Sequence, residues 1–160
     1  MSGATVSWIR RRGWLAWGAV ILVVSVVPVE WVFGLAPRQS WSPLAALGHF
    51  TEFGLFAALV TIAWAGAHGG RGPGRATAAR ATTDPATVGL TMGALAGVSY
   101  GAAIELIQAP IPYRSADPLD FLTDVGGVAV ALALVWYVRR RRARRVAPAA
   151  ADDPASGGGR

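Results

Sequence analysis

Four blocks of apolar residues, each about 20 residues long, set the strongest limit on how this chain can fold. They cover residues 14–36, 45–66, 87–107 and 119–138. An α-helix rises about 1.5 Å per residue, so each block is long enough to cross the roughly 30 Å hydrocarbon layer of a bilayer. Hydrophobic residues make up 53% of the chain and charged residues only 15%, which is less charge than a soluble domain carries. The sequence therefore predicts an all-α protein, a four-helix transmembrane bundle.

Arginines gather on one side of the predicted membrane. They lie before the first block (10–12), between the second and third (71, 75 and 80) and after the fourth (139–145). The positive-inside rule places these segments, and with them both termini, in the cytoplasm. The linkers on the other side hold only Arg38 and Arg114. The net charge of +6 therefore indicates topology anchors beside the anionic lipid of the bilayer, with no nucleic-acid partner.

Three regions follow from this pattern. Residues 1–13 form a basic cytoplasmic N-terminus, residues 14–138 the transmembrane domain, and residues 139–160 a basic anchor with a disordered tail. The basic start and the first apolar block also fit a signal peptide, but the block is long for one, which favours an uncleaved helix. Whether the first helix is cleaved stays open. The absence of cysteine excludes disulfides and thiol catalysis.

Glycine recurs at every fourth position of the third block. The series is Gly89, Gly93, Gly97 and Gly101. Small residues at this spacing let a second helix approach closely, either within the chain or in a homodimer. Glu105 occupies the next position, so we expect its side chain to point between helices. In the second block, Gly54, Ala58 and Ala65 lie on the face opposite His49, so the same argument does not place His49 between helices.

Polar side chains interrupt the outer ends of three blocks. The pairs are His49 with Glu52, Glu105 with Gln108, and Asp120 with Asp124. The members of each pair are three or four residues apart and share a helix face. A charged residue at the centre of a membrane helix costs about 2.5–3.5 kcal/mol, and less near the interface. These groups should therefore face one another or a water-filled pocket, which predicts a functional site.

The outer side carries more acid than base. The acids are Glu30, Glu52, Glu105, Asp117, Asp120 and Asp124, against the two arginines named above. Protonation, a divalent cation or a cationic ligand would balance them. His49 with carboxylates suits Zn²⁺ or Mn²⁺, and carboxylates alone suit Mg²⁺ or Ca²⁺, although no compact motif such as HExxH is present.

The linker before the fourth block has a structural role of its own. Asp117 fits the N-cap position of a helix and Pro118 its first residue. Pro110 and Pro112 stiffen the turn, which would hold Arg114 over the acids. There Arg114 would be the counter-ion of the acids, or it would bind a phosphate or carboxylate ligand through paired N–H donors.

The stretches LGHFTEFGLF and ELIQAPIPYRSADPLDFLTDVGG resemble the VanZ-like family of small bacterial membrane proteins. The family's pattern is a His–Phe pair, then Glu-x-x-Gln, an Arg, an Asp, an Asn and a Gly. The matching positions are His49, Phe50, Glu105, Gln108, Arg114, Asp120, Asp124 and Gly127, with Asp124 in place of the Asn. The resemblance implies a cell-envelope protein associated with glycopeptide resistance, teicoplanin in particular, and no established reaction.

Three functions are compatible with these residues. The first is an outer-leaflet site for the headgroup of a lipid, a lipid-linked wall precursor or a lipid-tailed glycopeptide. Its residues would be His49, Glu52, Glu105, Gln108, Arg114, Asp120 and Asp124. The second is a hydrolase or transferase acting on a phosphorylated lipid, with His49 or Glu105 as general base or nucleophile and Arg114 on the phosphate. The third is a closed polar network that only orients helices, which the excess of acid argues against.

Overall fold

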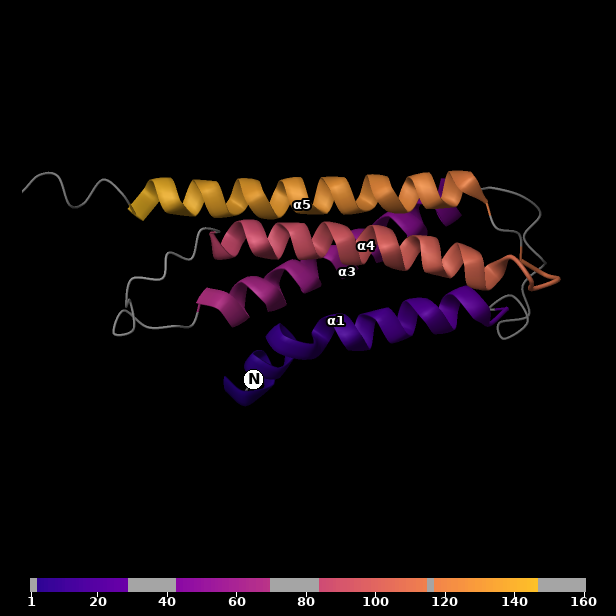
Figure 1. Cartoon of the computed structure of the whole chain (residues 1–160), viewed down its shortest axis with the longest axis horizontal. Coiled ribbons are helices and arrows are strands. Elements are labelled where there is room, and N and C mark those ends of the chain that lie inside the picture. Colours follow the sequence, from indigo (N-terminus) through magenta and orange to yellow (C-terminus); the bar gives the residue numbers. More distant parts are fainter. Residues whose placement is uncertain (1–2, 29–42, 70–83, 115–116, 147–160) are drawn as a thin grey trace, which may run out of the picture.

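The computed structural model describes residues 3–28, 43–69, 84–114 and 117–146, and every regular element within these ranges is an α-helix. The helices are α1 (Gly3–Val26), α3 (Pro43–Gly69), α4 (Pro85–Gln108) and α5 (Pro118–Val146). They run lengthwise beside one another (Figure 1). The predicted all-α class is confirmed.

Three of these helices are long and apolar enough to cross a membrane, namely α3, α4 and α5. They coincide with the second, third and fourth predicted blocks and support a multi-pass membrane protein. Helix α1 departs from the first block, because it begins at Gly3, contains residues 10–12 within its length and ends at Val26. About 14 residues, roughly 20 Å of helix, follow Arg12 in α1, which is short for a crossing. Residues 29–42 lie outside the described residues, so a membrane crossing by the first block stays a prediction.

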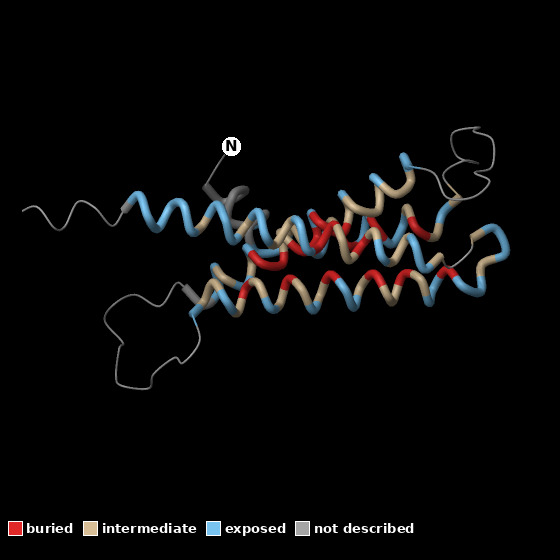
Figure 2. Tube along the Cα trace, turned by 90° about the horizontal axis from the view of Figure 1, so that it is seen from above, coloured by how far each residue is buried: buried red, intermediate tan, exposed pale blue. Residues whose placement is uncertain are grey.

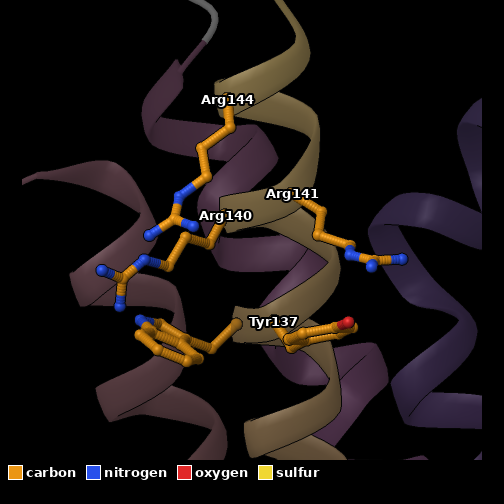
Figure 3. A pocket seen from close by; sticks show the side chains of 5 residues that line it. Tyr137, Arg140, Arg141 and Arg144 are labelled. Atoms are coloured by element: carbon orange, nitrogen blue, oxygen red, sulfur yellow. The ribbon is translucent and has the colours of Figure 1, made fainter.

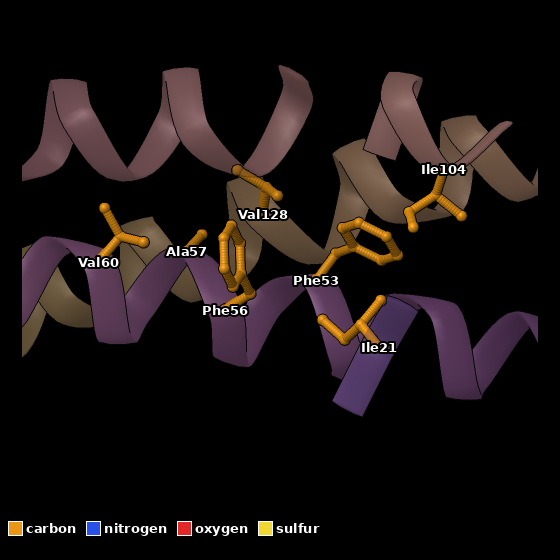
Figure 4. Packing of buried hydrophobic residues seen from close by; sticks show 7 residues of the cluster. All are labelled: Ile21, Phe53, Phe56, Ala57, Val60, Ile104 and Val128. Carbon is orange, nitrogen blue, oxygen red and sulfur yellow. The ribbon is translucent and has the colours of Figure 1, made fainter. Parts of the chain in front are cut away.

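All four helices contribute to one apolar core. Its buried members are Ile21, Phe53, Phe56, Ala57, Val60, Ile104 and Val128 (Figure 4). Helix α3 supplies four of the seven and contacts each of the other three helices. The outward faces of the apolar helices carry exposed residues such as Leu95, Leu106 and Leu134, as expected where lipid is the neighbour. Figure 2 shows this alternation of buried and exposed positions along the helices.

The glycine series of α4 is buried over its whole length. A Cβ atom added at Gly89 would lie 2.8 Å from the Thr61 carbonyl oxygen, and one at Gly97 would lie 2.7 Å from Val128. The predicted close packing is therefore confirmed, and its partners are α3 and α5 of the same chain. These glycines make their close contacts within the chain, and a homodimer through them stays a prediction.

A second close approach joins α3 to α5. A Cβ atom at Gly54 would lie 2.9 Å from the Gly127 carbonyl oxygen, and one at Gly127 would overlap the backbone of Phe50. This contact was not predicted, because the glycine that receives it lies on a helix whose register the sequence does not reveal. Phe50 follows His49, and Gly127 lies one turn after Asp124. This contact therefore sets the imidazole opposite the carboxylate.

Candidate functional site

Helices α3, α4 and α5 bring five of the predicted site residues together at the end of the bundle where α3 and α5 begin. We call this group the acid–imidazole cluster; it consists of His49, Glu52, Glu105, Asp120 and Asp124. The His49 Nδ1 donates a hydrogen bond of 3.0 Å to Asp124 Oδ1. The other ring nitrogen, Nε2, lies 3.8 Å from Asp120 Oδ2. The imidazole thus joins two acids of α5 to α3.

The His49–Asp124 pair is held by its apolar surroundings. The Phe53 ring lies nearly parallel to the imidazole at 6.4 Å between centroids. Asp124 is only 1% exposed. A Cβ atom at Gly101 would lie 3.1 Å from Asp124 Oδ2, so the missing side chain at Gly101 leaves room for the carboxylate. The last glycine of the α4 series therefore serves the site as well as the helix packing.

Glu105 ties the end of α4 to the start of α5. Its Oε2 accepts a hydrogen bond of 2.9 Å from the backbone N–H of Asp117. Asp117 in turn accepts one of 2.9 Å from the backbone N–H of Leu119, which confirms the predicted N-cap. Glu105 points between helices, as the glycine series predicts.

Three carboxylate oxygens of the cluster are buried and have no hydrogen-bond partner among the described residues. They are Glu105 Oε1, Asp120 Oδ1 and Asp124 Oδ2. Leaving a buried polar group unpaired costs about 1–3 kcal/mol, and more when the group is charged. Electrostatic interactions link Glu105 with both aspartates and His49, and Glu52 with His49 and Asp124. The cluster therefore holds more acceptors than donors.

The other two predicted site residues, Gln108 and Arg114, donate their hydrogen bonds to the end of α1. Gln108 Nε2 donates a hydrogen bond of 3.0 Å to the Ser25 carbonyl. Arg114 donates from one guanidinium nitrogen to the carbonyls of Val24, at 3.1 Å, and Val27, at 3.0 Å. We call Gln108, Tyr113 and Arg114 the α1 clamp, because Tyr113 also donates a hydrogen bond, of 3.1 Å, to the Val26 carbonyl.

The α1 clamp solves a general problem of helix ends. The last carbonyls of a helix have no partner within the helix, and an unpaired carbonyl is expensive in or near lipid. A guanidinium at this position also interacts favourably with the helix dipole. The prediction that Arg114 sits over the acids is therefore not what the structure shows. Tyr113 was missed because a single tyrosine in a linker carries no spacing pattern.

The described residues contain no group of three or more histidine, aspartate or glutamate side chains arranged to hold a metal ion. The divalent cation considered from the sequence thus finds no support in the geometry of these ranges.

Comparisons with family models, curated proteins and solved structures find no match to this chain. The resemblance to the VanZ-like family therefore rests on the residues named above and stays a prediction.

Proposed function

We propose that this chain is a multi-pass protein of the bacterial cell membrane whose acid–imidazole cluster binds the cationic head of an envelope ligand. That ligand is a lipid headgroup, a lipid-linked wall precursor or a lipid-tailed glycopeptide. The observation that carries the proposal is the trio of buried oxygens on Glu105, Asp120 and Asp124 without a hydrogen-bond partner in the described residues. A charged N–H donor would satisfy such oxygens and balance their charge.

The charges around the site favour a cation over a phosphate. The acid–imidazole cluster contains four carboxylates and one imidazole, and the nearest predicted anion-binding residue, Arg114, donates to the end of α1 instead. An anionic headgroup beside these carboxylates would add repulsion. The proposal thus narrows the predicted ligand class to headgroups that carry an ammonium or guanidinium group.

The orientation of the chain supports an envelope ligand. The cluster lies where α3 and α5 begin, and the arginines of 139–145 lie at the far end of α5 (Figure 1). The positive-inside rule assigns that arginine end to the cytoplasm and the cluster to the exterior. An exterior site beside wall precursors agrees with the predicted resemblance, and we expect the chain to alter susceptibility to glycopeptides.

Cysteine labelling tests this orientation, because the chain has no cysteine of its own. Pro112 and Ala143 are exposed and lie near opposite ends of the bundle. In intact cells a membrane-impermeant maleimide should label a cysteine at 112 and should label one at 143 only after lysis. The reverse pattern would place the cluster in the cytoplasm and remove the envelope ligand.

Histidine NMR tests the binding itself, since the chain has only two histidines, His49 and His68. In a His68→Ala background, isotope-labelled histidine reports on His49 alone. A long-chain alkylammonium added in neutral detergent should shift the His49 signals saturably, while the matched alkyl phosphate should leave them unchanged. The headgroup is then the only variable between the two amphiphiles.

Two variants control this measurement. Glu105→Gln should weaken the alkylammonium response, because it removes a charge beside the unpaired oxygens. Asp84→Asn removes an acid at the opposite end of α4 and should leave the response intact. An unshifted His49 with alkylammonium, or equal responses to both amphiphiles, would refute a cation site and leave the closed polar network as the better description.

A hydrolase or transferase acting on a phosphorylated lipid is the second candidate, favoured by one observation. Asp124 accepts a hydrogen bond from Nδ1 of His49, which leaves Nε2 as the nitrogen that takes up a proton. A carboxylate holding a histidine in this way is the arrangement of many hydrolytic sites. Turnover of a lipid phosphate by the purified protein, lost in His49→Gln and kept in His68→Gln, would establish it. The absence of turnover would leave binding alone.

A further inference from the structure

A shallow groove of about 420 Å³ lies on α5 near its C-terminal end, far from the acid–imidazole cluster. Its lining consists of Trp136, Tyr137, Arg140, Arg141 and Arg144. Figure 3 shows Arg140 and Arg144 extending to one side of the helix, and Arg141 to the other side beside Tyr137. Two aromatic rings and three guanidinium groups thus gather at this end of α5, on two sides of the helix.

Each ring of the groove carries an arginine. The Arg140 guanidinium carbon lies 4.9 Å from the centre of the Trp136 ring, and that of Arg141 lies 5.2 Å from the centre of the Tyr137 ring. Both pairs are separated by four residues and so are neighbours on the helix surface. Stacking restrains the plane of a guanidinium while leaving its N–H edge free to donate to an oxyanion.

The positive charge of this groove is not neutralised within the described residues. Both ion pairs found among the described residues involve His49, at the other end of the bundle, and neither involves Arg140, Arg141 or Arg144. Three arginines at adjoining positions repel one another unless an anion or salt intervenes. An anionic ligand with several oxygens would therefore bind favourably.

The residues that precede the groove along α5 indicate which class of anion would bind there. Val130 and Leu134 are 55% and 60% exposed, and by helical period they share a face with Tyr137 and Arg141. An apolar stripe thus leads along the membrane-crossing part of α5 to an aromatic ring and then to a guanidinium. Aromatic rings favour the headgroup level of a bilayer, where phosphates also lie.

We propose that this aromatic–arginine groove is a binding site for an anionic phospholipid. Arg141 donates hydrogen bonds to the lipid phosphate, one acyl chain lies along Val130 and Leu134 on the same face, and Arg140 and Arg144 add positive charge from the other side of the helix. The site is distinct from the acid–imidazole cluster in position and in charge. It also differs from general attraction of a basic tail to anionic lipid, because it assigns the contact to one set of arginines within the run.

Charge-matched variants separate the site from general attraction. Arg142 and Arg145 belong to the same run, are exposed, and do not line the groove. We compare Arg140→Gln/Arg141→Gln with Arg142→Gln/Arg145→Gln, which remove the same charge. Purified full-length protein in neutral detergent is titrated with dioleoyl phosphatidylglycerol, and bound lipid is counted by native mass spectrometry.

The groove variant should lose at least about tenfold in apparent affinity, since this factor corresponds to losing one charge-assisted hydrogen bond to the phosphate. The control variant should lose less than about threefold, since exposed charges outside the groove act on the phosphate only through screened attraction. Arg140→Lys/Arg141→Lys keeps the charge but loses the planar fork, and we expect a loss of several-fold. Phosphatidylcholine should bind weakly to all of these proteins.

Equal losses in the groove and control variants would overturn the proposal in favour of general attraction. Competition by soluble glycerol phosphate as strong as that by the lipid would show a free-anion site and would overturn the lipid assignment. Displacement of the lipid by a short oligonucleotide at comparable concentration would do the same. A charge-preserving lysine variant with full affinity would refute the role of the stacked guanidinium groups.

Discussion

The α1 clamp and the acid–imidazole cluster lie at the same end of the bundle, yet they treat their polar groups in opposite ways. In the clamp, Gln108, Tyr113 and Arg114 donate to the carbonyls of residues 24–26, the last of α1, and of Val27, which follows it. In the cluster, three buried acid oxygens find no donor among the described residues. Satisfied groups of the first kind hold a fold together, whereas unsatisfied groups of the second kind require a further partner, and we propose that a ligand supplies it.

This difference changes how intramembrane polar residues should be interpreted. Depth and charge alone put Arg114 and Asp124 in one site, and both are costly to place in lipid. Their partners separate them, because the arginine uses its donors on a helix end and the aspartate keeps one oxygen unpaired. The comparison predicts that clamp variants change stability and cluster variants change binding.

The largest effect on stability should come from Arg114→Ala. The variant lacks the guanidinium group, so the carbonyls of Val24 and Val27 each lose a hydrogen bond from a charged donor. We expect the free energy of unfolding to fall by about 2–4 kcal/mol. Reversible unfolding in mixed detergent micelles measures it, with Arg114→Lys as a control that keeps charge at the helix end and loses less.

The same variant can break the comparison. Alkylammonium binding by the folded fraction of Arg114→Ala should match that of the parent protein. A large loss of binding with unchanged stability would return Arg114 to the ligand site, where the sequence pattern had put it.

Much of the fold could be predicted because it depends on local pattern. The lengths of three apolar blocks, the N-cap at Asp117 and the glycine series of α4 each follow from neighbouring residues, and the structure confirms them. The extent of α1 was not predicted, because helix can continue through residues 10–12 into the basic segment. The length of an apolar block predicts the segment that crosses the membrane, but it does not predict where the helix that contains this segment begins.

The site could be predicted only in part, because its geometry depends on how separate helices meet. Spacing places His49 and Asp124 at one depth, and the Gly54–Gly127 contact then brings them together. Nothing in the spacing shows that Arg114 reaches the end of α1, since that contact joins segments 90 residues apart in the sequence. Residue types and spacing therefore predicted that polar side chains gather at this end of the bundle. Only the packing of the helices shows which of them meet one another and which donate to α1.

Gln108→Met should have the next largest effect. Gln108 is buried, and its amide donates to the Ser25 carbonyl, so an apolar side chain of similar size leaves that carbonyl unpaired. We expect a loss of about 1–3 kcal/mol in the free energy of unfolding. Gln108→Glu is the companion variant, and a loss smaller than that of Gln108→Met would contradict the donor role.

Tyr113→Phe should have a smaller effect. Tyr113 is 47% exposed, so water can replace the hydroxyl as the partner of the Val26 carbonyl. We expect a loss of about 0.5–1 kcal/mol, measured in the same unfolding experiment. An effect as large as that of Gln108→Met would mean that solvent does not reach this end of α1, and the clamp would then be as buried as the cluster.

Asp124→Asn should change stability least and binding most. The amide oxygen can still accept the hydrogen bond from His49 Nδ1, and the substitution removes a buried negative charge whose second oxygen has no partner. Because a neutral amide costs less to bury than a carboxylate, this gain offsets the weaker hydrogen bond to His49, and the free energy of unfolding should stay within about 0.5 kcal/mol of the parent. Affinity for the alkylammonium should fall at least about tenfold, which corresponds to losing one charge-assisted hydrogen bond.

Asp117→Asn is the matched control for Asp124→Asn, because the substitution removes an acid from the same end of the bundle. Asparagine is also a good N-cap, so the start of α5 should be preserved. It should keep both stability and binding. If both variants lost binding equally, the total negative charge of this end would attract the ligand and the buried oxygens would not select it. If Asp124→Asn bound normally and only lost stability, the acid–imidazole cluster would be a structural network like the clamp, and the contrast between the two regions would disappear.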